Sequence, residues 1–190
     1  MKRILSTGLV VGVICASGAW AADGAAVTQR DVNQQDRIEA GLKSGQLTTG
    51  EAARLEHKEG TVDRMEARDM KDGKLTAAET AKINAAQNRV SQDIYRQKHD
   101  AQAGNPDSAS SQRMQADVQR NANQEARIGQ GLKSGALNGQ EAARLERGQA
   151  KVDQNEARAG ANGHVSAGEQ REIRHAQKRQ SRQIHRKKHD

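Results

Sequence analysis

Apolar residues recur along this chain at the spacing of α-helices. Ile38 and Leu42 lie four positions apart, Leu55 and Val62 lie seven apart, and the same offsets recur downstream. This spacing places apolar side chains on one face of a helix, and no stretch alternates as a strand would. The pattern predicts an all-α protein, with helices at 29–43, 49–70, 77–98, 119–133, 139–159 and 167–188.

The chain contains a tandem repeat. Residues 28–100 align without a gap on residues 118–190, and about half of the aligned positions are identical. The segment between the copies holds the only proline, Pro106, among Gly, Asn, Asp and Ser, a composition typical of linkers. We therefore expect two tandem three-helix units built from helix-loop-helix repeats, at 22–100 and 118–190, joined by a flexible linker at 101–117.

The first residues have the features of an export signal. Lys2 and Arg3 precede the short apolar run "ILSTGLVVGVICASG", and Ala19-Trp20-Ala21 offers a cleavage site. The sequence predicts a cleaved signal peptide at 1–21, a periplasmic or secreted protein, and no transmembrane span after cleavage, because the run is shorter than a span requires. The only cysteine, Cys15, lies inside this segment, so the mature chain has no thiol or disulfide.

The composition limits the apolar core. Aromatic residues make up 1% of the chain and charged residues 29%. So small a supply of bulky apolar side chains favours thin, coiled-coil-like helical seams lined with Ala over a single large core. We expect marginal stability for the isolated chain, and self-association.

Four loops share one sequence pattern, "SGQLTTGE", "DGKLTAAE", "SGALNGQE" and "NGHVSAGE". In each, a cap-forming residue is followed three positions later by Glu, which is the pattern of a helix capping box. The preceding glycine can adopt the left-handed conformation that ends a helix. Each loop is therefore predicted to end one helix and cap the next.

The same loops resemble the rear half of the EF-hand calcium loop. The resemblance implies two candidate metal sites, whose oxygen ligands would come from Asp72, Thr76 and Glu79 and from Asn162, Ser166 and Glu169. At the first and third ligand positions the chain instead has Arg68 and Met70, then Arg158 and Gly160. We therefore expect capping rather than tight calcium binding here, and no cofactor; a bound divalent cation is the alternative.

A second, shorter resemblance concerns the helix starts. "LTTGEAARLE" and "LTAAETAKI" are similar to the LTxxQ segments of the Spy/CpxP family, with Glu in place of Gln. That family contains small all-helical periplasmic proteins that act as stress chaperones or metal-resistance accessories. The resemblance therefore implies a role in envelope stress.

Charge is unevenly divided between the copies. The chain has a formal net charge of +7, and the excess lies in the second copy, mainly in "REIRHAQKRQSRQIHRKKHD". An anionic envelope component, such as lipopolysaccharide or anionic lipid, or an acidic protein client could neutralise it. Intracellular nucleic acid is not expected, because no aromatic side chains are interleaved for base stacking. The predicted anion-binding residues are Arg171, Arg174, Lys178, Arg179, Arg182, Arg186, Lys187 and Lys188.

His185 and His189 give a further candidate metal site. Their i, i+4 spacing puts both rings on one side of a helix, as in many metal-binding pairs. The surrounding basic residues oppose a cation, so the pair is an alternative metal site only; they are Arg182, Arg186, Lys187 and Lys188.

No constellation of residues points to catalysis. The mature chain lacks a thiol, a supported Ser-His-acid arrangement and a phosphate-binding glycine loop. We expect an exported non-catalytic helical repeat protein, a periplasmic binding or envelope-stress accessory protein whose basic C-terminal unit binds an anionic partner. Two alternatives remain, a divalent-metal-binding protein of EF-hand ancestry and a chaperone-like holdase.

Overall fold

The computed structural model describes residues 19–189, which form six α-helices and no strand. The predicted all-α class is confirmed. The helices are α1 (Ala19–Ser44), α2 (Thr49–Asp69), α3 (Ala77–Lys98), α4 (Ala109–Ser134), α5 (Gly139–Gly160) and α6 (Ala167–His189), with a short 3-10 turn η2 (Met70–Asp72) after α2. The predicted signal peptide lies outside the described residues except for 19–21, which begin α1. Within the described range, no helix is long and apolar enough to cross a membrane.

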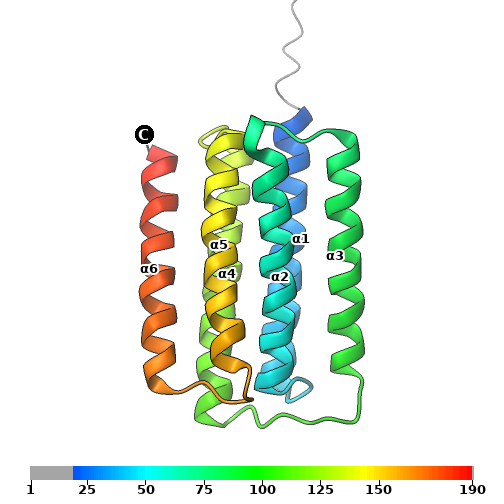
Figure 1. Ribbon diagram of the computed structural model, residues 1–190, viewed down its shortest axis with the longest axis vertical. Helices are drawn as coiled ribbons and strands as arrows, with labels where there is room; N and C mark the ends of the chain where they lie inside the picture. The colour runs from blue at the N-terminus through cyan, green and yellow to red at the C-terminus, as the bar shows by residue number, and fades with distance from the viewer. Residues whose placement is uncertain (1–18, 190) are drawn as a thin grey trace, which may run out of the picture.

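The helices run up and down along one axis, side by side (Figure 1). Four of them, α1, α2, α4 and α5, form the centre; α3 packs on α1 and α2 at one edge, and α6 packs on α4 and α5 at the other. The most extensive contacts join α1 to α4 and α2 to α5, so the main helix pairs each combine the two copies. The tandem repeats therefore share one bundle with approximate two-fold symmetry.

Two helices begin about ten residues earlier than the apolar pattern predicted. The chain enters α4 at Ala109, inside the segment expected to be a linker, and Ser108 caps it by accepting a hydrogen bond from the Ser111 N–H. The first turns of α4 bury Ser110 and Ser111, and such polar positions leave no hydrophobic period to detect. The remaining connection is anchored, because the Gly104 N–H donates to the Gly45 carbonyl at 2.8 Å.

The expectation of thin helical seams in place of a single core is wrong. Apolar residues of both copies, among them Ile38, Leu55, Ile128 and Leu145, belong to one buried cluster. Composition suggested otherwise because many interior positions of this bundle are filled by polar side chains rather than by Leu, Ile or Val.

The predicted capping boxes are present at all four loops. Thr48, Thr76 and Asn138 each exchange reciprocal hydrogen bonds with the Glu three residues later, and Ser166 does the same with Glu169. The four loop glycines all have positive φ, from 74° to 99°, as left-handed helix ends require.

Candidate metal centre

The EF-hand-like positions lie at the ends of the bundle, where their oxygens turn the chain and cap helices. Asp72 Oδ1 accepts the Lys74 N–H at 3.2 Å, and the Thr76 hydroxyl donates to Glu79 Oε2 at 2.7 Å. In the second copy, Asn162 Oδ1 accepts the His164 N–H, and Ser166 pairs with Glu169. Asp72 and Asn162 are exposed.

His185 and His189 lie on the exposed side of α6, with ring centroids 4.4 Å apart. At the equivalent place on the first copy, Tyr95 and His99 also form a ring pair with centroids 4.1 Å apart, stacked at 26° where the histidine pair is tilted at 49°. The ring pair is therefore shared by both copies, although only one copy has two imidazoles.

The strongest candidate site lies in the interior of the bundle. Eleven carboxylic side chains of the four central helices are each at most 2% exposed. Glu51 belongs to the capping box of α2 and Asp117 pairs with Arg120. The other nine are Asp31, Glu56, Glu59, Asp63, Glu66, Glu125, Glu146, Asp153 and Glu156. Among residues 19–189, no Lys, Arg or His is buried, and none of these nine forms a salt bridge. We call these nine residues the carboxylate core.

Sequence reasoning missed the carboxylate core, although a signal was present. On α2 the residues at 56, 59, 63 and 66 follow a three-four-three spacing, and α5 repeats it at 146, 149, 153 and 156. This spacing places all four side chains on one helix face. The stripe resembles an ordinary solvated face, and only the pairing of α2 with α5 turns it inward. Gly60 allows a close approach, because a Cβ there would lie 3.0 Å from Asp153 Cβ.

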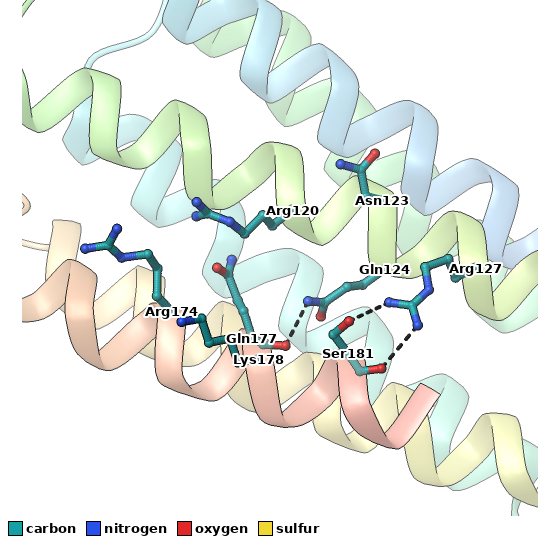
Figure 2. Close-up of a pocket in the computed structure, with 8 residues that line it drawn as sticks. All are labelled: Arg120, Asn123, Gln124, Arg127, Arg174, Gln177, Lys178 and Ser181. Carbon is teal, nitrogen blue, oxygen red and sulfur yellow. Dashed lines mark hydrogen bonds between the residues drawn. The ribbon is translucent and has the colours of Figure 1, made fainter. Parts of the chain in front are cut away.

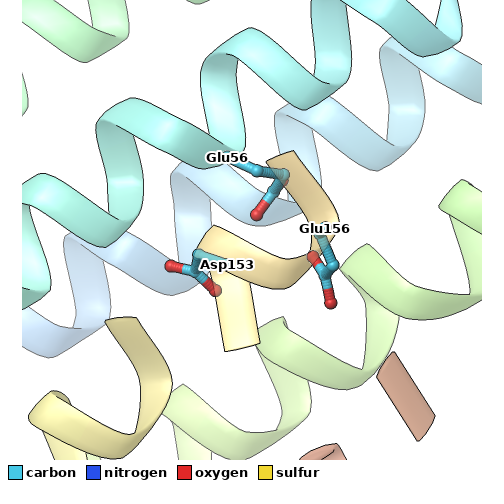
Figure 3. A group of neighbouring side chains, drawn as sticks. All are labelled: Glu56, Asp153 and Glu156. Atoms are coloured by element: carbon cyan, nitrogen blue, oxygen red, sulfur yellow. The ribbon is translucent and has the colours of Figure 1, made fainter. Parts of the chain in front are cut away.

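The carboxylate core divides into two centres related by the approximate two-fold symmetry. Centre A contains Glu56 of α2, Asp153 and Glu156 of α5, Gln35 of α1 and Asn121 of α4. Figure 3 shows its three carboxylates, which each offer one oxygen within 4.8 Å of the others.

Centre B is the symmetry-related set, and each centre draws on all four central helices. It contains Glu146 of α5, Asp63 and Glu66 of α2, Glu125 of α4 and Asp31 of α1. Here Asp63, Glu125 and Glu146 meet the same 4.8 Å criterion. The remaining member of the carboxylate core, Glu59, belongs to neither centre and has charged neighbours from both, Glu56 of centre A and Asp31 and Asp63 of centre B.

Amide side chains hydrogen-bond to centre A. Gln35 Nε2 donates to Glu56 at 3.1 Å, and Asn121 Nδ2 donates to Asp153 at 3.1 Å and to Glu156 at 2.7 Å. Gln177, from α6, donates to the other oxygen of Glu156 at 2.9 Å. These donors hold the carboxylates of centre A in place.

Centre B has few such donors. Gln87 of α3 donates to Asp31 at 2.7 Å and to Glu66 at 3.3 Å. No N–H or O–H group donates to either oxygen of Glu125 or Glu146, nor to Asp31 Oδ2, Asp63 Oδ2 and Glu66 Oε2, although Glu125 and Glu146 lie within hydrogen-bonding range of each other. Buried oxygens without a donor are energetically costly, so this centre favours a bound cation or shared protons.

Burial raises the pKa of every carboxyl group in the carboxylate core. It raises the pKa of Asp31 and of Glu56 to about 7, against hydrogen bonds from Gln87 and Gln35 that lower it. The other seven carboxyls have pKa values well above the usual range, because of burial first and of neighbouring carboxylates second. Ionising these groups together without counter-charge costs several kcal/mol per group.

The donor chemistry of both centres is restricted to oxygen. Carboxylate and amide oxygens suit hard cations such as Ca²⁺, Mg²⁺ and Mn²⁺, whereas zinc, copper and nickel sites usually include His or Cys. No buried His or Cys lies among the described residues. The carboxylate core can therefore act as a hard-cation site.

A second feature is a basic groove between α4 and α6 (Figure 2). It brings Arg174 and Lys178, two of the predicted anion-binding residues, beside Arg120 and Arg127 of α4. Arg127 is fixed by hydrogen bonds to the Ser181 hydroxyl and carbonyl at 2.7 and 3.1 Å. Arg120 pairs with Asp117 at 2.9 Å.

The other predicted anion-binding residues are distributed around α6. Arg179 faces α5, in a groove that also contains Arg144, Arg147, Lys151 and Arg158. Lys187 lies 3.6 Å from Glu141. Arg171, Arg182 and Arg186 are exposed, and Lys188 is partly exposed. Sequence reasoning thus found the basic residues of α6 but not their basic neighbours on α4 and α5.

Comparisons with protein-family models, with curated proteins and with solved structures found no match to this chain.

Proposed function

We propose that this protein binds hard divalent cations, with Ca²⁺ as the first candidate, inside its helical bundle. The observation that carries the proposal is the carboxylate core, which gathers nine buried carboxyls without a buried basic side chain in the described part of the chain. Cations at the two centres would supply the missing positive charge and would give ligands to the unpartnered oxygens. This is the sequence-based alternative of divalent-metal binding, moved from the loops to the interior.

A purely protonated core is the competing explanation. Shared protons would neutralise the carboxyls, but a proton on one oxygen serves one neighbouring acceptor. A proton shared between Glu125 and Glu146 would satisfy one oxygen of each and leave their other two oxygens without a donor. A cation with six to eight oxygen ligands serves all of them together.

Calorimetric titration of the full chain with Ca²⁺ at neutral pH tests the proposal. We expect binding by the wild-type protein, and a large loss of affinity in the double variant Asp63→Asn/Asp153→Asn. Asp63 belongs to centre B and Asp153 to centre A, and their carboxyls lie within hydrogen-bonding range of each other. Removing both negative charges weakens both centres, since calcium affinity depends on the charge of the ligands.

The matched control is Glu79→Gln, which removes a carboxylate from an EF-hand-like loop. We expect it to weaken the cap of α3, at a cost of about 1 kcal/mol, and to leave calcium binding unchanged. Loss of binding in Glu79→Gln with full binding in Asp63→Asn/Asp153→Asn would place the cation in the loops instead. Absence of Ca²⁺ and Mn²⁺ binding by the wild type would refute the proposal.

The basic groove supports a second function, binding of a phosphate-bearing anionic surface. The first copy has Asn84 and Asn88 at the positions of Arg174 and Lys178, so the extra charges belong to the second copy alone. Nine of the 24 acidic side chains lie in the carboxylate core, which leaves a strongly basic exterior. Together with the export signal expected from the sequence, this favours an anionic envelope component as the partner.

Replacing these two residues by their first-copy equivalents tests the groove. We expect Arg174→Asn/Lys178→Asn to weaken salt-sensitive binding to phosphatidylglycerol vesicles roughly 30-fold, at about 1 kcal/mol per basic residue. Lys82→Asn/Arg89→Asn, on α3 of the neutral copy, removes the same charge as a control. Equal losses in both double variants, measured by vesicle sedimentation, would show a general charge effect rather than a groove.

A further inference from the structure

Building on the proposed function, we infer that the two centres are unequal: centre B binds the first and tighter calcium-sized cation, and centre A binds a weaker second one. The inference rests on the residues at which the two copies differ inside an otherwise symmetric core.

Two substitutions distinguish the centres. Glu125 of centre B occupies the repeat position of Gln35 in centre A, and Asp31 of centre B occupies that of Asn121. The other three positions are the same in both copies, two Glu and one Asp. Centre B therefore has five carboxylates, and centre A has three carboxylates and two amides.

The availability of ligand oxygens differs in the same direction. Seven carboxylate oxygens of centre B have no hydrogen-bond donor, whereas centre A leaves one carboxylate oxygen, Glu56 Oε1, and one amide oxygen, Gln35 Oε1, in that state. Glu125 and Glu146 are 2% and 0% exposed, and their oxygens lie within 4.8 Å of Asp63. Ca²⁺ takes six to eight oxygen ligands at 2.3–2.6 Å, and these three carboxylates offer six oxygens if each binds through both of its own.

In centre A the amide donors compete with a cation. Asn121 donates to both Asp153 and Glu156, so a cation there must displace or reorient hydrogen bonds that already satisfy the carboxylates. In centre B the corresponding residue, Asp31, has no proton to donate when ionised and offers another ligand oxygen. The first cation is therefore expected to bind with a more favourable free energy at centre B than at centre A.

The burial of centre B from solvent favours a calcium-sized cation over a smaller one. Mg²⁺ dehydrates reluctantly and usually keeps several waters, whereas Ca²⁺ accepts an all-protein oxygen shell. The five carboxylates of centre B are each at most 2% exposed. We therefore expect centre B to select Ca²⁺ over Mg²⁺.

Exchanging the differing residues between the centres tests the inference. Asp31→Asn/Glu125→Gln gives centre B the side chains of centre A, and Gln35→Glu/Asn121→Asp makes the opposite change. All four substitutions preserve side-chain shape. Calcium titrations in competition with a chelator, repeated with Mg²⁺, measure the affinities, and circular dichroism reports folding.

For the wild type we expect one tight and one weak calcium phase, at least about 100-fold apart, because calcium affinity varies over many orders of magnitude with ligand charge. Asp31→Asn/Glu125→Gln should lose the tight phase, and Gln35→Glu/Asn121→Asp should gain a second one. If one of the two variants does not fold, the calcium titration of the other variant still tests whether the centres are unequal.

Equal affinities in the wild type, or a tight phase that survives Asp31→Asn/Glu125→Gln, would overturn the inequality and leave the proposed function standing. A wild-type protein that binds no cation would overturn the proposed function, and the inequality with it.

Discussion

Adding Ca²⁺ to the metal-free protein at neutral pH is expected to raise its melting temperature by roughly 8–16 °C. A ligand that binds only the folded state at about 1,000 times its Kd stabilises that state by about 4 kcal/mol. For a chain of this size, each kcal/mol shifts the melting temperature by roughly 2–4 °C. The physical reason is that the carboxylate core has no buried basic side chain within residues 19–189, so the cation supplies its counter-charge.

Thermal unfolding followed by circular dichroism, in Ca²⁺ and in chelator, measures this shift. In Asp63→Asn/Asp153→Asn we expect the metal-free protein to be more stable than the wild type, because two buried carboxyls are gone, and the response to Ca²⁺ to be largely lost. Asp93→Asn is the control, since Asp93 lies at the surface in ion pairs with Lys58 and Arg96. Superimposable wild-type curves in Ca²⁺ and chelator would count against a structural cation.

The second large effect is a loss of stability of the metal-free protein as the pH rises from about 4 to above 7. Burial raises the folded-state pKa of Asp31 and Glu56 to about 7, and that of the other members of the carboxylate core well above the usual range. At a pH between the pKa of the unfolded state and the pKa of the folded state, the folded protein binds more protons than the unfolded protein does. Stability is then greatest below the unfolded pKa and falls as the pH passes through the folded pKa, by about 1.4 kcal/mol per pH unit for each extra proton.

Surface cations reduce this trend only in part. Arg30 acts on Asp31, Arg37 on Glu59 and Arg64 on Asp63, and in each case burial has the larger effect on the pKa. Asp93 has the opposite effect on the pH dependence of stability. Lys58 lowers its pKa, so the stability that Asp93 contributes is lost on acidification instead.

Melting temperatures of the metal-free protein from pH 4 to 8, with a parallel series in saturating Ca²⁺, measure the pH effect. We expect the metal-free values to fall with pH and the Ca²⁺ series to stay flat or rise, since bound carboxylates are ionised and binding releases protons. A metal-free protein that grows steadily more stable from pH 4 to 8 would contradict the pKa shifts.

The chain's local structure was predictable because its causes are local. The spacing of Ile38 and Leu42 predicted a helix, and the Thr76 and Glu79 pair predicted a cap, without reference to any distant residue. The start of α4 was not predicted, because Ser110 and Ser111, which are buried in its first turns, are polar.

The carboxylate core was not predictable in the same way. Whether the stripe containing Glu56, Asp63 and Glu66 faces water or the interior depends on which helix packs against it. The first copy alone would leave that stripe unpaired; the cross-copy pairing of α2 with α5 buries it. The basic groove likewise needs Arg120 and Arg127 of α4 to lie beside α6.

The sequence by itself thus determined the helices, their caps, the repeat and the uneven charge, all of which depend on residues close together along the chain or on simple self-comparison. Only the tertiary structure decided that the two copies share one bundle and that nine carboxylates meet inside it. Helix pairing sets burial, and burial decides whether an acidic stripe is a solvated surface or a centre for cations.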